Sequence, residues 1–326
     1  MLKRRRLLVI SFSLVSLLAL VLSSCNPTGT PRTQTPVNGG TWIDDIPNEV
    51  GSLIPFVSNE DTILDDLKAG SITSSWLLDV SKTNTYKSLA NYQLAVNPNA
   101  SNFEVMIINL KNPILGANLD VRKAMAMAID RDALIKTARL GQALPLCTDH
   151  GKAYVPGYQA DAPCPKFDPA AANALLDQDG WVKGSDGVRS KNGQRLEFKY
   201  STTTGSPWRA TDELIIQSNF KDIGIKIDIQ NYPASTFFGK FLPNGKHDLA
   251  EFENSYTYDG DDTSLLACDQ QGTQGQNWSF YCSQQMDNLL HQEQQSASPD
   301  VRQQAFNQIY QIELTTVPVR HSLQSR

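Results

Sequence analysis

The sequence predicts an α/β fold, and one segment in the second half of the chain carries most of that prediction. Leu196, Phe198 and Tyr200 alternate with charged residues, which is typical of a strand with one buried face. A helix is predicted from about 208 to 221, and isoleucines at alternate positions of 225–229 predict another strand. A strand, a helix and a second strand in this order form a βαβ-like unit, which is characteristic of α/β domains.

Residues 1–24 have the parts of a bacterial lipoprotein signal peptide. Basic residues at 3–6 precede an apolar run over 7–22, which has the length of a signal-peptide core and is short for a membrane span. Leu22-Ser23-Ser24-Cys25 then matches a lipoprotein cleavage pattern. We therefore expect cleavage before Cys25 and acylation of this cysteine, with palmitate among the lipids. The lipid would hold the chain at the extracytoplasmic face of the membrane, in the periplasmic space if the cell has an outer membrane. An uncleaved anchor with an incidental cysteine is the alternative.

The segment that follows the signal is predicted to be a tether. Residues 25–40 are rich in Pro, Thr and Gly and lack apolar periodicity, so they have little to bury. The folded domain is expected over 41–326, beginning with a strand at 41–43.

Charge excludes some partners. The 326-residue chain has a formal net charge of −5, and without the four cations of the signal the remainder is at about −9. Such an acidic chain has no electrostatic reason to bind nucleic acid or an anionic membrane surface.

Two helix starts are predicted from capping residues in the first half of the domain. Asp120 is expected to cap a helix over 121–129, and Asp130 a second helix over 133–140 that ends at Gly141.

Further elements follow from proline and glycine positions. Asp168-Pro169 predicts the start of a helix over 170–178, which Gly180 ends, and Asn192-Gly193 predicts a hairpin turn. Beyond the βαβ unit, we expect a short helix at 235–241, a strand at 248–252, a helix from Ser298-Pro299 to about 313, and an extended stretch from 317.

Four cysteines remain after Cys25 is assigned to the lipid. They are Cys147, Cys164, Cys268 and Cys282, which allow three pairings. We favour Cys147–Cys164 and Cys268–Cys282, because each pair closes a short loop. Four free buried thiols are the alternative, whereas zinc is disfavoured because no Cys-x-x-Cys pair is present.

No motif for catalysis is found, so we predict that the chain is not an enzyme. The four histidines are scattered, and neither a phosphate-binding glycine loop nor a Gly-x-Ser-x-Gly elbow occurs. No metal site or cofactor is predicted. The strongest candidate for ligand binding is Tyr256, Tyr258 and Asp259, directly after the 248–252 strand, where aromatic faces and a carboxylate suit a cationic amine. A solvated acidic turn is the alternative.

Several motifs together resemble family 5 of the bacterial extracellular solute-binding proteins, the oligopeptide-, dipeptide- and nickel-binding components of ABC importers. The matching motifs, in chain order, are Gly39-Gly40-Thr41-Trp42, Ser52-Leu53-Ile54-Pro55, Asp120-Val121-Arg122-Lys123-Ala124, Ala128-Ile129-Asp130-Arg131-Asp132, Phe167-Asp168-Pro169, Asp186-Gly187-Val188-Arg189, Lys221-Asp222-Ile223-Gly224-Ile225 and His247-Asp248-Leu249-Ala250.

The resemblance implies a clamshell of the type II periplasmic-binding class, and the chain departs from it in two ways. Residues 59–63 run almost directly into 67–70, where the family has a long lobe segment, and the end comes early. The expected architecture is therefore incomplete, with one main lobe and part of the hinge. In addition, Thr257 stands where peptide-binding members place an aspartate for the ligand amine, and Asp259 lies two residues on.

The function implied is the lipid-anchored binding component of an importer for peptides or related small solutes. Its partners would be the solute, an ABC permease with its ATPase, and the membrane through the Cys25 lipid. The alternative is a shortened, non-transporting paralogue or remnant that needs a partner chain to bind ligand.

Overall fold

The computed structural model describes residues 60–75, 82–95, 102–146, 165–255, 259–316 and 322–325. The predictions that fall outside these residues are the signal at 1–24, Cys25 and the tether, the strand at 41–43, the extended stretch from 317 to 321, and four site residues, Cys147, Cys164, Tyr256 and Tyr258.

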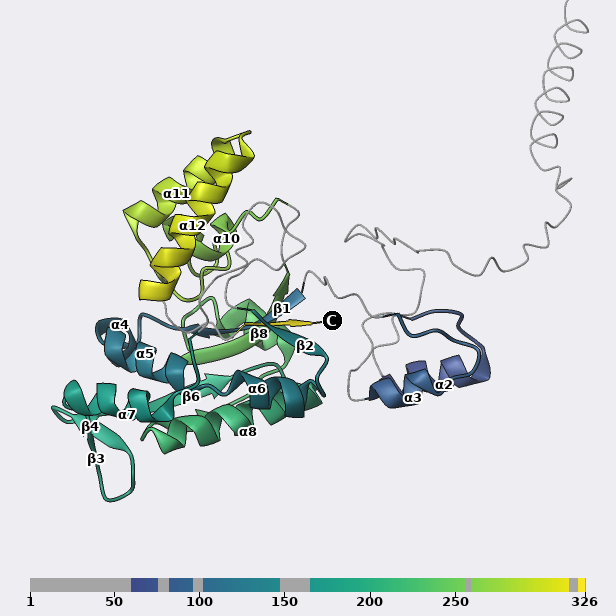
Figure 1. Ribbon diagram of the computed structural model, residues 1–326, viewed down its shortest axis with the longest axis horizontal. Coiled ribbons are helices and arrows are strands. Elements are labelled where there is room, and N and C mark those ends of the chain that lie inside the picture. Colours follow the sequence, from purple (N-terminus) through teal and green to yellow (C-terminus); the bar gives the residue numbers. More distant parts are fainter. Residues whose placement is uncertain are drawn as a thin grey trace, which may run out of the picture. The chain divides into compact units, whose positions relative to one another are not determined.

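A six-stranded mixed sheet has the strand order β2-β9-β1-β8-β6-β7 (Figure 1). Its antiparallel half contains β1 (Asn102–Ile108), β2 (Ala143–Leu146), β8 (Leu249–Ser255) and β9 (Ser322–Ser325). Strand β6 (Glu197–Ser201) pairs in parallel with β8 and with β7 (Lys226–Ile229). The sheet therefore combines a parallel unit with an antiparallel one, which gives the predicted α/β class.

The predicted βαβ unit is confirmed. Helix α8 (Pro207–Asp222) connects β6 to β7, and its Ile216 and Phe220 are buried in one core with Phe198 and Tyr200 of β6. Gly224 lies between α8 and β7 with φ +81°, and a Cβ on it would lie 2.7 Å from Cγ of Arg189. Glycine is required there for both reasons.

Two helices ahead of this unit pack against the same core. Helix α5 (Leu119–Ala128) begins at Leu119 after an N-cap at Asn118, so the prediction that Asp120 is the cap is wrong. Asp120 lies in the first turn of α5, where its carboxylate is 3.6 Å from Nζ of Lys123. The short helix α4 (Pro113–Ala117) comes just before and leaves Asn118 extended, so α5 can start earlier.

The cap at Asp130 is confirmed, because its Oδ1 accepts a hydrogen bond of 2.9 Å from the Ala133 amide. The helix it begins is α6 (Arg131–Ala133), which continues as a π-helical turn, η2 (Leu134–Ala138), so the helical segment starts and ends two residues earlier than predicted.

Helix α7 (Pro169–Gln178) and the hairpin turn at Asn192-Gly193 are found as predicted, and the hairpin belongs to a small sheet. Asp168 caps α7 through a 2.8 Å hydrogen bond from the Ala171 amide. The sheet contains β3 (Val182–Lys183), β4 (Arg189–Lys191) and β5 (Gln194–Arg195), with Asn192-Gly193 turning between the last two at positive φ.

The other face of the large sheet has a core of its own. Alternate residues of β1 and β8 pack there with Phe237 and Phe241 of the π-helical turn η3 (Phe237–Phe241), which follows α9 (Ala234–Thr236), and with Trp278. Helices α10 (Thr263–Leu266), α11 (Gln284–Gln295) and α12 (Pro299–Thr316) share a third core.

Helices α2 (Glu60–Ala69) and α3 (Thr83–Lys87) form a small cluster through Leu64, Leu67 and Tyr86.

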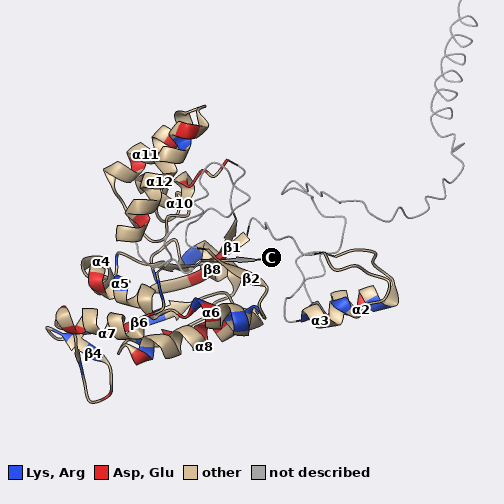
Figure 2. Cartoon of the chain, viewed as in Figure 1, with Lys and Arg blue, Asp and Glu red and all other residues tan. Residues whose placement is uncertain are grey.

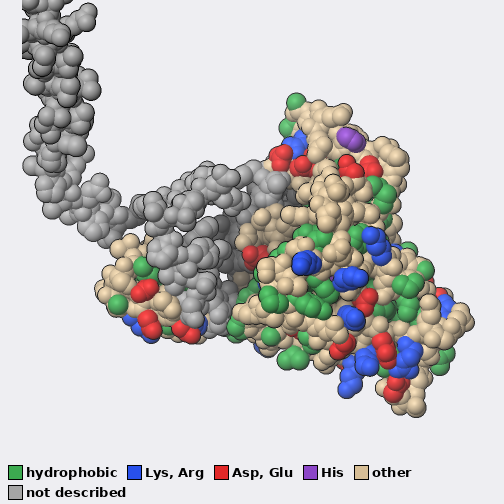
Figure 3. Space-filling view, turned by 180° about the vertical axis from the view of Figure 1, so that it is seen from behind, with side chains coloured by type: hydrophobic (Ala, Val, Ile, Leu, Met, Phe, Trp, Pro, Cys, Tyr) green, Lys and Arg blue, Asp and Glu red, His purple; other side chains and the backbone are tan. Residues whose placement is uncertain are grey.

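None of the helices within the described ranges has the length and apolar character to cross a membrane. Hydrophobic and charged side chains are interspersed on the face seen in Figure 3.

Candidate functional site

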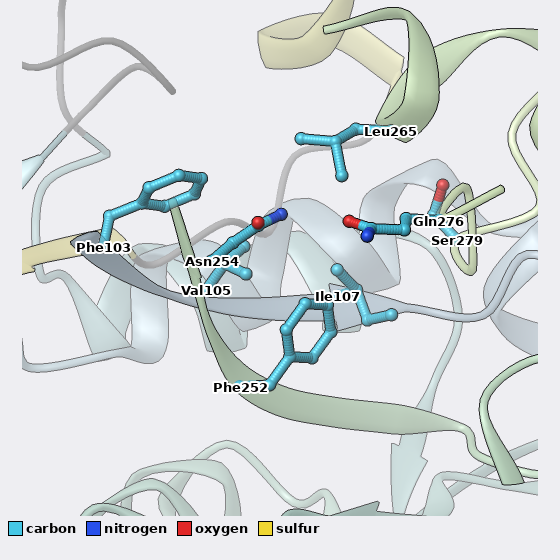
Figure 4. A pocket seen from close by; sticks show the side chains of 8 residues that line it. All are labelled: Phe103, Val105, Ile107, Phe252, Asn254, Leu265, Gln276 and Ser279. Carbon is cyan, nitrogen blue, oxygen red and sulfur yellow. The ribbon is translucent and has the colours of Figure 1, made fainter. Parts of the chain in front are cut away.

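A hollow lies over β1 and β8, on the face opposite α5, α7 and α8. Phe103, Val105 and Ile107 reach it from β1, and Phe252 and Asn254 reach it from β8. The antiparallel register sets Phe103 beside Asn254 and Val105 beside Phe252, so the five side chains form one continuous floor (Figure 4).

The opposite wall comes from the chain that follows β8. Leu265 extends from α10 towards the floor, and Gln276 and Ser279 come from the loop after η4 (Cys268–Gln270) (Figure 4). The buried side chain of Asn277 holds this loop in place. Its Nδ2 donates to the carbonyl oxygens of Ala267 at 2.9 Å and Tyr281 at 2.8 Å.

A disulfide between Cys268 and Cys282 closes the same loop. This is the second of the two predicted pairs, and the structure confirms it. The backbone N–H of Gln276 also donates to the backbone carbonyl of Ser264 at 2.9 Å. The backbone carbonyl of Ser279 accepts from the backbone N–H of Leu110 at 2.9 Å. The wall of the hollow is therefore attached to α10 on one side and to the end of β1 on the other.

The hollow offers apolar surface and neutral hydrogen-bonding groups. Five of its eight lining residues are apolar, and the other three are Asn254, Gln276 and Ser279. Its cavity volume is about 20 Å³, which is room for a group about the size of a water molecule. Within the described ranges, no group of His, Cys, Asp and Glu side chains is arranged to hold a metal ion. The arrangement can therefore bind a small uncharged group.

Asp259, the described member of the predicted ligand-binding trio, lies in an acidic segment between β8 and α10 (Figure 2). It is exposed, and its carbonyl oxygen accepts a hydrogen bond from Arg302 of α12. The next carboxylates are bound locally: Asp261 Oδ1 accepts from the Thr263 amide at 2.8 Å and Oδ2 from Gln294 at 3.0 Å. The segment thus runs from Asp259 directly into the helix that carries Leu265.

Three carboxyl groups are buried around this acidic segment. Burial raises the pKa of Glu293 to about 7, although Arg302 lies 2.9 Å away, and burial raises the pKa of Asp262 and Glu313 well above the usual range.

A second group of buried charges lies on the other face of the same strands. Glu104 of β1 binds Arg209 through a 2.8 Å contact, and Tyr200 donates a hydrogen bond to Glu251 of β8. Burial raises the pKa of Glu104 to about 7 and that of Glu251 well above its usual range.

Arg139 and Arg209 lie over the ring of Trp208, at 3.7 and 4.4 Å from its centroid, and Arg139 is 2.7 Å from the Asp212 carboxylate. Because residues alternate along a strand, Glu104 of β1 and Glu251 of β8 are turned away from the hollow.

Sequence reasoning missed most of the hollow. A strand was predicted at 248–252, whereas β8 spans Leu249–Ser255, and no strand was predicted at 102–108, although Phe103, Val105 and Ile107 alternate there with Glu104 and Met106. That alternation was the available signal.

Comparison with known proteins adds three observations. The family model of the bacterial extracellular solute-binding proteins, family 5, matches residues 53–276. Protein XP55 of Streptomyces lividans is 28% identical over 193 residues, covering 58% of this chain and 34% of that protein. The oligopeptide-binding protein AppA of Bacillus subtilis is 25% identical over 201 residues, covering 59% of this chain and 36% of that protein.

Solved structures show the same fold. AppA from Bacillus subtilis in complex with a nonapeptide has a TM-score of 0.71 at 20% identity, covering 82% of this chain and 54% of that one. NikZ from Campylobacter jejuni in complex with Ni(L-His) has a TM-score of 0.69 at 22% identity, covering 82% and 55%.

The likeness confirms the predicted type II periplasmic-binding fold over about half of such a structure, and the chain spans about a third of the length of these curated relatives. Since the family model matches more than half of its residues, the chain belongs to family 5 of the bacterial extracellular solute-binding proteins.

Proposed function

We propose that the chain is the lipid-anchored substrate-binding component of an ABC importer for peptides or related small solutes. It captures the solute outside the cytoplasm and delivers it to a permease, and its role is binding rather than catalysis. Family membership and the likeness to an oligopeptide-binding protein solved with a nonapeptide support the peptide class.

One observation carries this proposal: the hollow over β1 and β8 opens beside the end of β8, where the acidic segment begins. In this proposal Tyr256, Tyr258 and Asp259 contact the solute, with the Asp259 carboxylate pairing with its amine. A solute that touches two lobes stabilises the closed arrangement by contacts that the open one lacks.

Binding is tested with the protein lacking residues 1–25, titrated by calorimetry with a pool of short peptides. We expect saturable binding and a higher melting temperature with peptide. Asp259→Asn should weaken binding about tenfold, whereas Asp269→Asn, which alters another exposed carboxylate, should leave it unchanged. Failure of all peptides to bind would contradict the proposal.

The half-length likeness to solved relatives supports a second candidate, a non-transporting paralogue that binds ligand only with a partner chain. Binding that appears only after a second chain is co-expressed would favour it.

The anchor is tested separately by labelling cells that express the whole chain with radioactive palmitate. We expect label in the wild type and none in Cys25→Ser, and equal labelling of both would refute lipidation at this residue.

A further inference from the structure

We propose that Glu293 of α11 and Asp261 form a carboxyl pair that holds the acidic segment, residues 259–262, against α11 and α12 only while the two groups share a proton. The pair is a pH-sensitive device, and the order of the segment falls as the pH rises above neutral. Its effect on the solute acts through Asp259 and therefore rests on the proposed function.

Arg302 of α12 connects Glu293 to the segment. Its Nη2 donates to Oε2 of Glu293 at 2.9 Å and also to the backbone carbonyl of Asp259. The side chain of Glu293 is 0% exposed, so this contact lies inside the packing of the two helices. One guanidinium therefore joins the backbone at Asp259 to a buried group of the helix pair.

The second oxygen of the Glu293 carboxyl group requires a proton. Among the described residues, no hydrogen-bond donor reaches this Oε1 atom, which is shielded from solvent. The protonated acid donates a hydrogen bond to the carboxylate of Asp261. Without the proton, two carboxylates would face each other where little water screens them, and like charges repel.

Asp261 is the member of the pair that stays charged. Its Oδ1 accepts from the backbone N–H of Thr263 at 2.8 Å, and its Oδ2 accepts from Nε2 of Gln294 at 3.0 Å. Burial raises the pKa of Asp261, but hydrogen bonds from these groups and from Glu293 outweigh burial and lower it. The shared proton therefore resides on Glu293, whose pKa burial raises to about 7.

Two further carboxyl groups face the same region. Asp262 is buried near Glu293, Asp261 and Asp259, and Glu313 of α12 lies near Asp262. Burial raises the pKa of Asp262 and of Glu313 well above the usual range. Ionisation of either would add negative charge beside the pair, so it would act in the same direction as ionisation of Glu293.

The sign of the pH dependence follows from Glu293. The ordered segment keeps the proton at pH values where a hydrated glutamate, with a pKa of 4.5, has lost it. The contribution of the pair to the order of the segment is therefore fully present below about pH 4.5, and it is lost as the pH rises through about 7.

Hydrogen exchange of the protein lacking residues 1–25 tests the pair without any solute. The reporters are two backbone N–H groups, that of Thr263, which donates to Asp261, and that of Leu265, which donates to the Asp262 carbonyl at 3.0 Å. Between pH 6 and pH 8.5, we expect their protection factors to fall about tenfold in the wild type, which corresponds to a local opening that is easier by one power of ten.

Glu293→Gln is the decisive variant. Its amide can donate to Asp261 and accept from Arg302 at every pH, so the protection factors should stay constant. At pH 8.5 they should exceed those of the wild type, a gain that loss of folding cannot produce. Asp300→Asn, which alters an exposed carboxylate of α12, should follow the wild type. Equal falls in the wild type and Glu293→Gln would overturn the inference.

Two substitutions of Arg302 test its connecting role. Arg302→Gln should lower the protection at pH 6 as well as at pH 8.5, and Arg302→Lys, which keeps the charge, should restore part of it. Unchanged protection in Arg302→Gln would show that Arg302 does not hold the segment, and it would overturn this part of the inference.

Calorimetry with the same pool of short peptides then measures the effect on the solute. The amino group of a peptide titrates at about pH 7.7–8.0 with both proteins, so the ratio of their affinities isolates the pair. We expect the affinity of Glu293→Gln relative to the wild type to be at least threefold higher at pH 8.5 than at pH 6. A constant ratio would overturn the effect on the solute. No binding at either pH would contradict the proposed function, whereas the exchange measurement would still decide whether the pair exists.

Discussion

Glu104 should make the stability of the domain depend on pH, and its replacement by glutamine should remove much of that dependence. The side chain is 2% exposed and binds Arg209 through two contacts, at 2.8 and 3.2 Å. Burial outweighs this partner and raises the pKa of the Glu104 carboxyl from 4.5 to about 7. Glutamine has nearly the shape of the protonated acid and does not ionise.

The sign follows from proton binding. The folded protein keeps the Glu104 proton at pH values where the unfolded chain has lost it. The contribution of Glu104 to the free energy of unfolding is therefore fully present below about pH 4.5, and it is lost as the pH rises through about 7. A pKa change from 4.5 to about 7 corresponds to about 3 kcal/mol in full, at about 1.4 kcal/mol per pH unit. Most of it, about 2 kcal/mol, falls between pH 5 and pH 8.

The assay is urea denaturation of wild type and Glu104→Gln at pH 5 and pH 8, with the disulfide intact. The loss of unfolding free energy between the two pH values should be smaller in the variant by about 2 kcal/mol. Glu197→Gln, which alters an exposed carboxylate on β6, should follow the wild type. Parallel pH dependences in wild type and Glu104→Gln would refute the reasoning, as would a larger dependence in the variant.

Three further predictions concern stability. Replacing Cys268 and Cys282 together by serine should lower the unfolding free energy by about 3 kcal/mol, because the bridge spans 14 residues; unchanged urea midpoints under oxidising conditions would contradict this. Gly224→Ala should cost about 1–3 kcal/mol more than Gly187→Ala. Both glycines have positive φ, but only at Gly224 does the new Cβ meet Arg189, so equal losses in thermal melts would rule out the steric term. Leu323→Ala, at 1% exposure in β9, should cost about 2–5 kcal/mol, whereas Leu323→Met should cost less than about 1.5 kcal/mol; similar melting temperatures for the two variants would argue against a buried role.

Local signals explain which elements could be predicted. The cap at Asp168, the turn at Asn192-Gly193 and the end of α7 before Gly180 each depend on residues close in sequence, and each is found in the structure. The alternation in β6 and β7 has the same local origin.

The hollow could not be predicted in the same way. Its floor needs Phe103 beside Asn254, and its wall needs Leu265 and Gln276 above that floor, so the pairing of distant strands decides it. Periodicity shows that a strand has two faces but not which partner covers each one. The raised pKa of Glu104 likewise depends on burial by elements from the whole chain.

The place of β9 in the sheet has a consequence for the order of folding. Strand β9 lies between β2 and β1, and Val105 pairs with Ser322, more than 200 residues later. The ribosome synthesises the chain from its N-terminus. Strand β2 therefore cannot be connected to β1 and the rest of the sheet until β9 has been synthesised, up to residue 325. Until then β1 and β2 each keep an unpaired edge, so the sheet closes only after synthesis has passed this strand.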